Sequence, residues 1–221
     1  MSVWDILTTY YPAFLSGLKV TLQLCAIIWT AGLILGGALG LAGNKFPKGV
    51  GFPSHGFSFL LGGIPLLVFL FWLHYPVQAM FDVVIDPFYT AAFTLSFVNI
   101  FAVADIVRGA LHDFPKQYLT AARVTGLTRK QTIFKIQLPL ILRETIPPLL
   151  LLQVAMLHTT LFSSLISVEE IFRVAQRINA QIYRPVEIYT ALGFFFLAVC
   201  LPVNAFAFWL KKRYTRNLSE Q

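Results

Sequence analysis

Five polar or ionisable side chains interrupt long apolar runs and are the first candidates for chemistry: Asn99, Asp105, Arg108, Gln153 and His158. Asp105 and Arg108 lie three residues apart, so on a helix they share one face and can pair. Ionisable groups inside a membrane segment are costly and by default functional. Two interpretations stay open for this pair: an internal ion pair that holds its helix in place, or a polar lining of a pathway. For the other three side chains, hydrogen bonds between helices are the expected role.

The sequence contains no pattern of a catalytic or metal centre. No stretch matches the phosphate-binding loop G-x-x-x-x-G-K-[ST], a nucleophile elbow or the zinc site H-E-x-x-H, and the four histidines are scattered. The two cysteines, Cys25 and Cys200, lie in apolar stretches far apart in the chain. We expect them to be small apolar core residues without a disulfide. The chain is therefore predicted to be no enzyme and to hold no metal.

Composition places the chain in a membrane. Of its 221 residues 57% are hydrophobic and 12% are charged, and the mean hydropathy is +0.71, whereas soluble domains carry about 25% charged residues. The 17 lysines and arginines exceed the 10 acids, a balance that can indicate nucleic-acid binding. Here the basic residues lie between and after the apolar runs, where they act as topology signals, so no nucleic-acid partner is expected.

Five apolar segments are long enough to span a bilayer, which takes about 20 residues. They predict an all-α membrane protein with about five transmembrane helices in a single domain, 1–221, at residues 15–42, 57–74, 88–111, 146–166 and 188–210. Gly32, Gly36 and Gly40 in the first segment are four residues apart, which predicts a smooth face for close approach of another helix. Pro147 and Pro148 are expected to shape the start of the fourth.

The lysines and arginines predict the orientation. Two of them follow the first segment, six follow the third and four follow the fifth, against three in the segment 167–187. The N-terminus is therefore predicted outside and the C-terminus in the cytoplasm, with the loop 112–143 cytoplasmic. In 167–187, Ile171, Val174, Ala175 and Ile178 follow helical spacing and predict an amphipathic helix on the outer face. This helix either closes the bundle or serves as a gate or docking surface.

A polar segment, residues 112–139, reads as two short helices joined by a turn. Asp113 can cap the first helix, and Gly126 can take the left-handed conformation that ends it. Thr128 and Gln131 have the spacing of a capping box for the second helix, and Pro139 is expected to end that helix.

The spacing of this segment is Thr120-Ala121-Ala122, three residues, Gly126, nine residues, Ile136, one residue and Leu138-Pro139. It resembles the EAA loop of ABC importer permeases, whose pattern is Glu-Ala-Ala, three residues, Gly, nine residues and Ile-x-Leu-Pro, with threonine here in place of the glutamate. The resemblance implies that an ATPase subunit docks at Thr120, Ala121, Ala122, Arg123, Gly126 and Leu127. ATP and magnesium would then belong to that partner, with no cofactor in this chain. The alternative is a helix pair on the membrane surface whose basic side chains face lipid headgroups.

A wider resemblance covers nearly the whole chain and points to permease subunits of the polar amino-acid uptake family. It is carried by Thr21-Leu22, Gly63, Pro65-Leu66-Leu67, Asp105-Ile106-Val107-Arg108-Gly109, Pro115-Lys116, Arg173-Val174-Ala175-Gln176 and Arg184-Pro185-Val186-Glu187-Ile188-Tyr189. Gly62 and Ile64 stand where that family usually has arginine and threonine.

The resemblance implies a permease subunit of an ATP-driven ABC importer for amino acids or similar small polar solutes in a bacterial inner membrane. The pathway would form with a second permease chain, as a homo- or heterodimer, and an external solute-binding protein would deliver the solute. Candidates for lining the pathway are Gly63, Pro65, Asn99, Asp105, Gln153 and His158. The alternatives are a secondary transporter or channel that works without ATP, and a non-transporting membrane scaffold with a permease fold.

Overall fold

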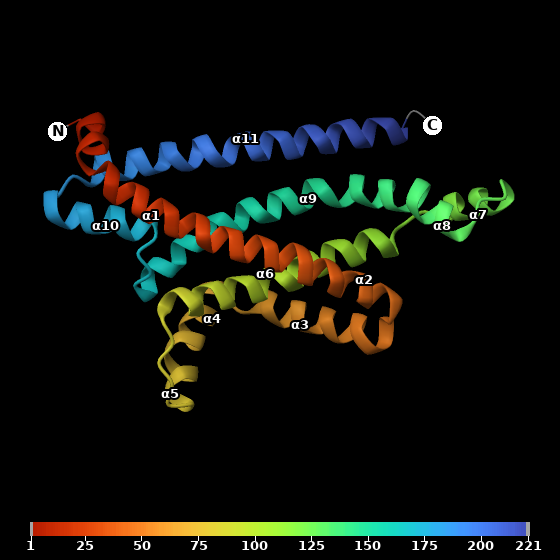
Figure 1. The fold of residues 1–221 in the computed structure, drawn as a ribbon, viewed down its shortest axis with the longest axis horizontal. Helices are drawn as coiled ribbons and strands as arrows, with labels where there is room; N and C mark the ends of the chain where they lie inside the picture. Colours follow the sequence, from red (N-terminus) through yellow and green to blue (C-terminus); the bar gives the residue numbers. More distant parts are fainter. Residues whose placement is uncertain (1, 220–221) are drawn as a thin grey trace.

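The computed structural model describes residues 2–219, and side chains for residues 2–214. Every regular element in that part is a helix, and most of the helices run side by side in an elongated bundle (Figure 1). In chain order they are α1 (Val3–Ala31), η1 (Gly32–Gly36), α2 (Gly37–Lys45), η2 (Pro47–Gly51), α3 (Phe52–Gly63), α4 (Leu66–Trp72), η3 (Leu73–Val77), α5 (Gln78–Met80), α6 (Pro87–His112), α7 (Lys116–Val124), α8 (Arg129–Thr132), η4 (Ile133–Gln137), α9 (Leu138–Thr159), η5 (Thr160–Ile166), α10 (Ile171–Ile182) and α11 (Pro185–Ser219). The predicted all-α class is confirmed.

Four helical stretches within the described residues are long and apolar enough to cross a membrane: Val3–Lys45, Pro87–His112, Arg129–Ile166 and Pro185–Tyr214. A fifth span results when the bent pair Pro47–Gly63 and Leu66–Met80 is counted as one. This agrees with the prediction of about five. Residues 1, 220 and 221 of the predicted domain lie outside the described part.

The first span is one continuous helix, and it begins earlier than its hydropathy predicts. Ser2 caps it by accepting a hydrogen bond from the Asp5 amide, and the Asp5 carboxylate accepts one from the Ser2 amide. Further along, a Cβ on Gly36 would lie 2.5 Å from the carbonyl oxygen of Ile100 in α6, and one on Gly40 would lie 2.8 Å from that of Ala104. The predicted close approach of helices at these glycines is confirmed.

The second predicted span is not a single straight helix. Its two parts meet at Ile64 and are bent by 98°, and the α4–α5 part leaves the bundle (Figure 1). Ile64 has the extended angles φ −105° and ψ 125°, which a following proline imposes, and Pro65 itself has no N–H for the helix ladder. Gly62 and Gly63 add no side-chain packing at the break.

Helix α6 lies in the middle of the bundle, where it contacts α1, α2, α3 and α9. The main apolar cluster joins it to α1 and α4 through Leu24, Ile28, Leu70, Ala91 and Leu95, all fully buried. Because α6 touches so many elements, its few polar side chains reach several helices at once.

The fourth span is longer than predicted, since the helix runs without a break from Arg129 to Ile166. Pro139 does not end it. The preceding turns, Ile133–Gln137, are widened, and the Leu138 amide donates to the carbonyl of Ile133 five residues back. The wide turn accommodates the proline ring and its missing donor. Pro147 and Pro148 likewise lie inside α9 and not at its start.

Helices α10 and α11 close the other side of the bundle. The four predicted apolar residues of α10, Ile171, Val174, Ala175 and Ile178, are buried against α1 and α11, so the amphipathic helix is confirmed. Cys25 and Cys200 are free and buried in one apolar cluster, as expected of small core residues.

Candidate functional site

The helix pair α7–α8 projects from one end of the bundle, and the local sequence fixes its turn. Gly126 has φ +73°, a left-handed conformation that suits glycine. The Leu127 amide donates to the Ala122 carbonyl at 3.0 Å, and the Gly126 amide donates to the Arg123 carbonyl at 3.1 Å, which together form a Schellman motif. The capping box predicted at Thr128 and Gln131 is present. Asp113 does not cap α7, because it ends α6 and Pro115 holds the cap position.

The structure separates the predicted docking residues into a surface set and a packing residue. Thr120, Ala121, Arg123 and Gly126 are exposed, Leu127 is half-buried and Ala122 is 1% exposed. Ala122 therefore lies inside the helix pair. The Thr120 hydroxyl donates to the carbonyl of Lys116, one turn back, at 3.3 Å.

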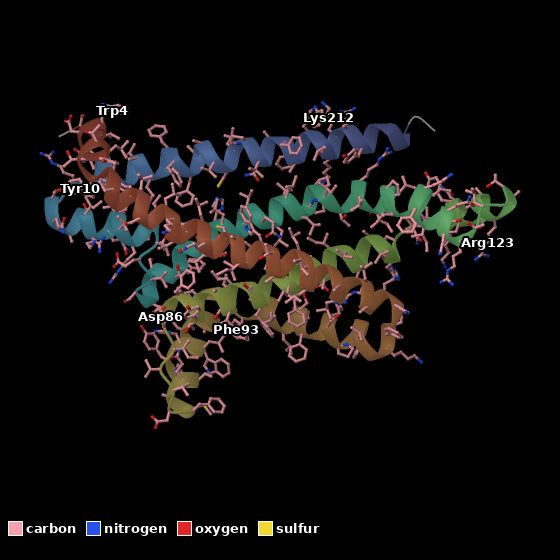
Figure 2. The ribbon with its side chains drawn as sticks, viewed as in Figure 1. Trp4, Tyr10, Asp86, Phe93, Arg123 and Lys212 are labelled. Carbon is pink, nitrogen blue, oxygen red and sulfur yellow. The ribbon has the colours of Figure 1, made fainter. Side chains whose placement is uncertain are left out.

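A groove of about 480 Å³ lies between α7 and the α8–η4 segment. Arg123 and Leu119 line it from α7, and Arg129, Thr132 and Ile133 line it from the other helix. Figure 2 places Arg123 at the extreme end of the molecule, beyond the end of α6. The groove combines two guanidinium groups with apolar walls, so it suits an anionic side chain that has an apolar neighbour.

Deeper in the bundle, Asn99 and Gln153 form a hydrogen-bonded pair between α6 and α9. The Asn99 amide nitrogen donates to the Gln153 side-chain oxygen at 3.1 Å and to the Ile28 carbonyl at 2.9 Å. The indole of Trp29 donates to the Gln153 carbonyl at 3.2 Å. Asn99 and Gln153 are both buried. The expected interhelical hydrogen bonds are confirmed, and they connect three spans.

Asp105 and Arg108 pair as expected, and they join α6 to the η2–α3 segment. The Arg108 guanidinium donates to Asp105, to the Gly51 carbonyl at 3.0 Å and to the Ser54 hydroxyl at 3.2 Å. The hydroxyl of Ser58 also donates to Asp105. The Asp105 side chain retains 30% exposure. The ion pair therefore joins two helical segments and remains partly open to the surroundings of the bundle.

The remaining pathway candidates lie elsewhere. His158 is exposed and its Nε2 lies 3.2 Å from the sulfur of Cys200 in α11. Gly63 and Pro65 are exposed at the bend between α3 and α4. Of the four predicted pathway residues with polar side chains, the structure brings together Asn99 and Gln153. No group of three or more histidine, cysteine or acidic side chains within the described residues could hold a metal.

Glu170 is a buried site that the sequence prediction missed. It is 0% exposed, and its carboxylate caps α10 by accepting from the Phe172 amide at 3.0 Å and from the Arg173 amide at 2.8 Å. Burial raises the pKa of Glu170 to about 7, although these two hydrogen bonds oppose the shift. Next to it, the Ile171 amide donates to the Thr21 hydroxyl of α1 at 3.2 Å. An acid directly before an amphipathic helix was the available signal.

A second missed group fastens the α4–α5 segment to α6. The amide nitrogen of buried Gln78 donates to the Thr90 hydroxyl at 3.1 Å and lies 3.2 Å from a ring nitrogen of His74. The Gln78 oxygen accepts from the Ile85 amide at 2.8 Å. A glutamine inside an apolar stretch was the signal here.

Comparison with known proteins matches the chain to one family. The model of the family described as binding-protein-dependent transport system inner membrane component matches residues 30–216. The chain is 29% identical over 220 residues to the L-cystine transport system permease protein TcyB of Bacillus subtilis (strain 168), covering 98% of this chain and 93% of the relative. It is 28% identical over 211 residues to the glutamine transport system permease protein GlnP of Escherichia coli (strain K12), covering 95% and 96%.

Among solved structures, the fold matches a crystal structure of an amino acid ABC transporter with histidines. The TM-score is 0.82 at 24% sequence identity, and the match covers 94% of this chain and 96% of the other. The architecture of a single transporter chain is therefore reproduced over nearly its full length.

Proposed function

Because the chain belongs to the family of binding-protein-dependent transport system inner membrane components, we propose that it is the permease subunit of a bacterial ATP-driven ABC importer for amino acids or similar small polar solutes. The family is one of transport permeases and not of enzymes. In this proposal the chain pairs with a second permease chain, receives solute from an external binding protein and lies in the inner membrane. ATP and magnesium are held by the ATPase subunits.

One observation carries the proposal for ATPase docking: the projecting α7–α8 pair. A Schellman turn and a capping box fix its shape, while Thr120, Ala121 and Arg123 remain exposed on its surface. Two short helices held at a fixed angle, with a small exposed alanine between polar side chains, form a compact surface for another protein. Ala122 supports this surface from inside.

The continuous helix from Arg129 to Ile166 supports a mechanical coupling. Force applied at the α7–α8 pair passes along this helix to Gln153, which is bonded to Asn99 of α6. Through the Ile28 carbonyl the same bonds reach α1. ATP-driven closure of the ATPase subunits would thereby shift three spans together as one body and switch access to the pathway.

The proposed orientation places the α7–α8 pair in the cytoplasm and the N-terminus outside. It is supported by the six lysines and arginines of 112–143, against three in the segment 167–187 at the other end. The start of α1 and the end of α11 lie at opposite ends of the bundle (Figure 1), as an odd number of crossings requires.

The test is co-purification of the chain with an ATPase subunit, followed by uptake in reconstituted vesicles. Gly126→Val should abolish association and ATP-driven uptake, because a β-branched residue is strained at a positive φ. Gly126→Asn is the matched control, since asparagine tolerates the left-handed region. Both variants must first elute as monodisperse protein.

Each outcome distinguishes the alternatives. Uptake that needs ATP and is lost only in Gly126→Val supports the proposal. Uptake that proceeds without ATP would establish a secondary transporter or channel. Vesicles that bind the ATPase but take up no amino acid under any condition would favour the non-transporting scaffold.

A further inference from the structure

The docking end of the molecule is mainly positive. The segment 112–143 carries six lysines and arginines and a single acid, Asp113, whose carboxylate lies 2.9 Å from a ring nitrogen of His112. Thr120 adds no charge, and its hydroxyl donates a hydrogen bond within its own helix, to the Lys116 carbonyl. A partner that contacts this surface therefore meets more cations than anions.

Two of these cations, Arg123 and Arg129, face the same groove between α7 and α8. Neither guanidinium forms an ion pair or a side-chain hydrogen bond with any side chain that the structure describes. Each guanidinium has five donors in a planar fork that matches a carboxylate. Two unpaired guanidinium groups beside one groove form a receptor for an anion.

The groove is already shaped in the isolated chain. Arg123 lies in the last turn of α7, whose end is fixed by the Gly126 turn. Arg129 opens the helix that the Thr128 capping box begins. Because hydrogen bonds hold the backbones of both walls, a ligand has little backbone to order when it binds.

Position and lining favour a protein over lipid as the source of the anion. Arg123 lies at the tip of the projecting pair, beyond the end of α6 and away from the apolar bundle (Figure 2). The groove walls also include the aliphatic side chains of Leu119, Leu127 and Ile133. A carboxylate beside an apolar side chain on a partner protein fits both the guanidinium groups and these walls, and the position at the projecting tip favours such a partner over lipid.

We propose that the α7–α8 groove binds an acidic side chain of the ATPase subunit between Arg123 and Arg129, with an apolar neighbour of that acid against Leu119 and Ile133. This rests on the proposed function and adds the polarity of the contact: the permease supplies the cations and the ATPase supplies the carboxylate. The contact would hold the ATPase on the permease without an acid at position 120.

The experiment measures the affinity of the full chain for its co-purified ATPase subunit in nanodiscs of neutral phosphatidylcholine. Arg123→Glu and Arg129→Glu should each weaken binding by roughly tenfold or more, because both place a like charge against the acid. Lys130→Glu is the matched control, since Lys130 is an exposed cation of the same helix that does not line the groove. Sodium chloride should weaken wild-type binding more than that of an Arg123→Gln/Arg129→Gln double variant.

A compensating charge reversal on the ATPase subunit identifies the acidic residue that the groove binds. Among Asp→Lys and Glu→Lys exchanges on the ATPase surface, one should restore binding to Arg123→Glu and not to the Lys130→Glu control. If a reversal variant aggregates, the glutamine variants supply the same comparison without a new charge.

The outcomes separate the two claims. A wild-type chain that binds no ATPase overturns the proposed function itself. Normal binding by the arginine variants, or equal loss with Lys130→Glu, overturns the acidic contact and leaves docking intact. Wild-type binding that requires anionic lipid, with the arginines affecting only lipid binding, assigns the groove to headgroups and also overturns the contact.

Discussion

Replacing Glu170 with glutamine removes an ionisable group from a buried helix cap while keeping its size and one acceptor oxygen. The pKa of this carboxyl is raised by burial from 4.5 to about 7. Since the raised value belongs to the folded state, the folded chain binds the proton more tightly than the unfolded chain does. The free energy of unfolding therefore falls as pH rises from about 4.5 to 7, and the full penalty is present above that window.

The magnitude follows from the shift. One pKa unit corresponds to about 1.4 kcal/mol, so the ionised carboxylate lowers the free energy of unfolding by roughly 3 kcal/mol at pH 8. Glutamine resembles the protonated acid. We expect Glu170→Gln to match the native chain at pH 4.5 and to be more stable by roughly 3 kcal/mol at pH 8.

Thermal unfolding of the purified protein in one detergent, measured at intervals from pH 4.5 to 8, tests this expectation. At about 2–4 °C per kcal/mol for a chain of this length, the midpoint of the variant should exceed the native one by several degrees at pH 8. Glu169→Gln is the control, because Glu169 is exposed and pairs with Arg177 at 2.9 Å on the surface. Because the charge of Glu169 is the smallest contribution to the raised pKa of Glu170, this variant should leave most of the pH dependence in place.

Two results would contradict the expectation for Glu170. Parallel pH profiles for Glu170→Gln and the native chain would show that burial does not raise the pKa of this group. A variant that is less stable at pH 8 would show that the α10 amides stabilise the carboxylate by more than its burial costs.

Two further substitutions test the packing of the bundle. Gly36→Ala should lower the free energy of unfolding by about 1–3 kcal/mol, because its Cβ would lie 2.5 Å from the Ile100 carbonyl oxygen; Gly37→Ala, with no atom within 4 Å, should be neutral or stabilising in the same thermal assay. Asn99→Leu should cost about 1–3 kcal/mol by leaving Gln153 and the Ile28 carbonyl without their donor, and adding Gln153→Leu should cost less than the sum of the single changes if the pair is coupled.

Features that depend on local sequence were predicted well. The φ of Gly126 and the Thr128 capping box follow from residues within one turn, and the sequence contains all of their partners. The glycine face of the first helix is similarly a matter of spacing. In each case the physical cause acts within about four residues.

Features that depend on distant partners or on backbone adjustments were not predictable in this way. Asn99 and Gln153 could be recognised as polar residues in apolar runs, but only the fold shows that they bind each other. From its local chemistry Pro139 was expected to end a helix, but the wide turn at 133–137 lets the helix continue. Ala122 faces the inside of the helix pair because of how α7 packs, and the spacing of residues in the sequence does not determine that packing.

The bend at Ile64 has a consequence for how the chain occupies a bilayer. The helical part from Pro47 to Gly63 has 17 residues, or about 25 Å at the rise of an α-helix, which is less than a typical hydrocarbon thickness of about 30 Å. If the axis of the bundle is perpendicular to the membrane, the helical residues after the 98° bend run along the membrane plane. Trp72 and Tyr75 are exposed there, and such side chains prefer the headgroup level. In that orientation the segment after the bend places Trp72 and Tyr75 at the level of the lipid headgroups, where they favour one depth of the bundle in the bilayer.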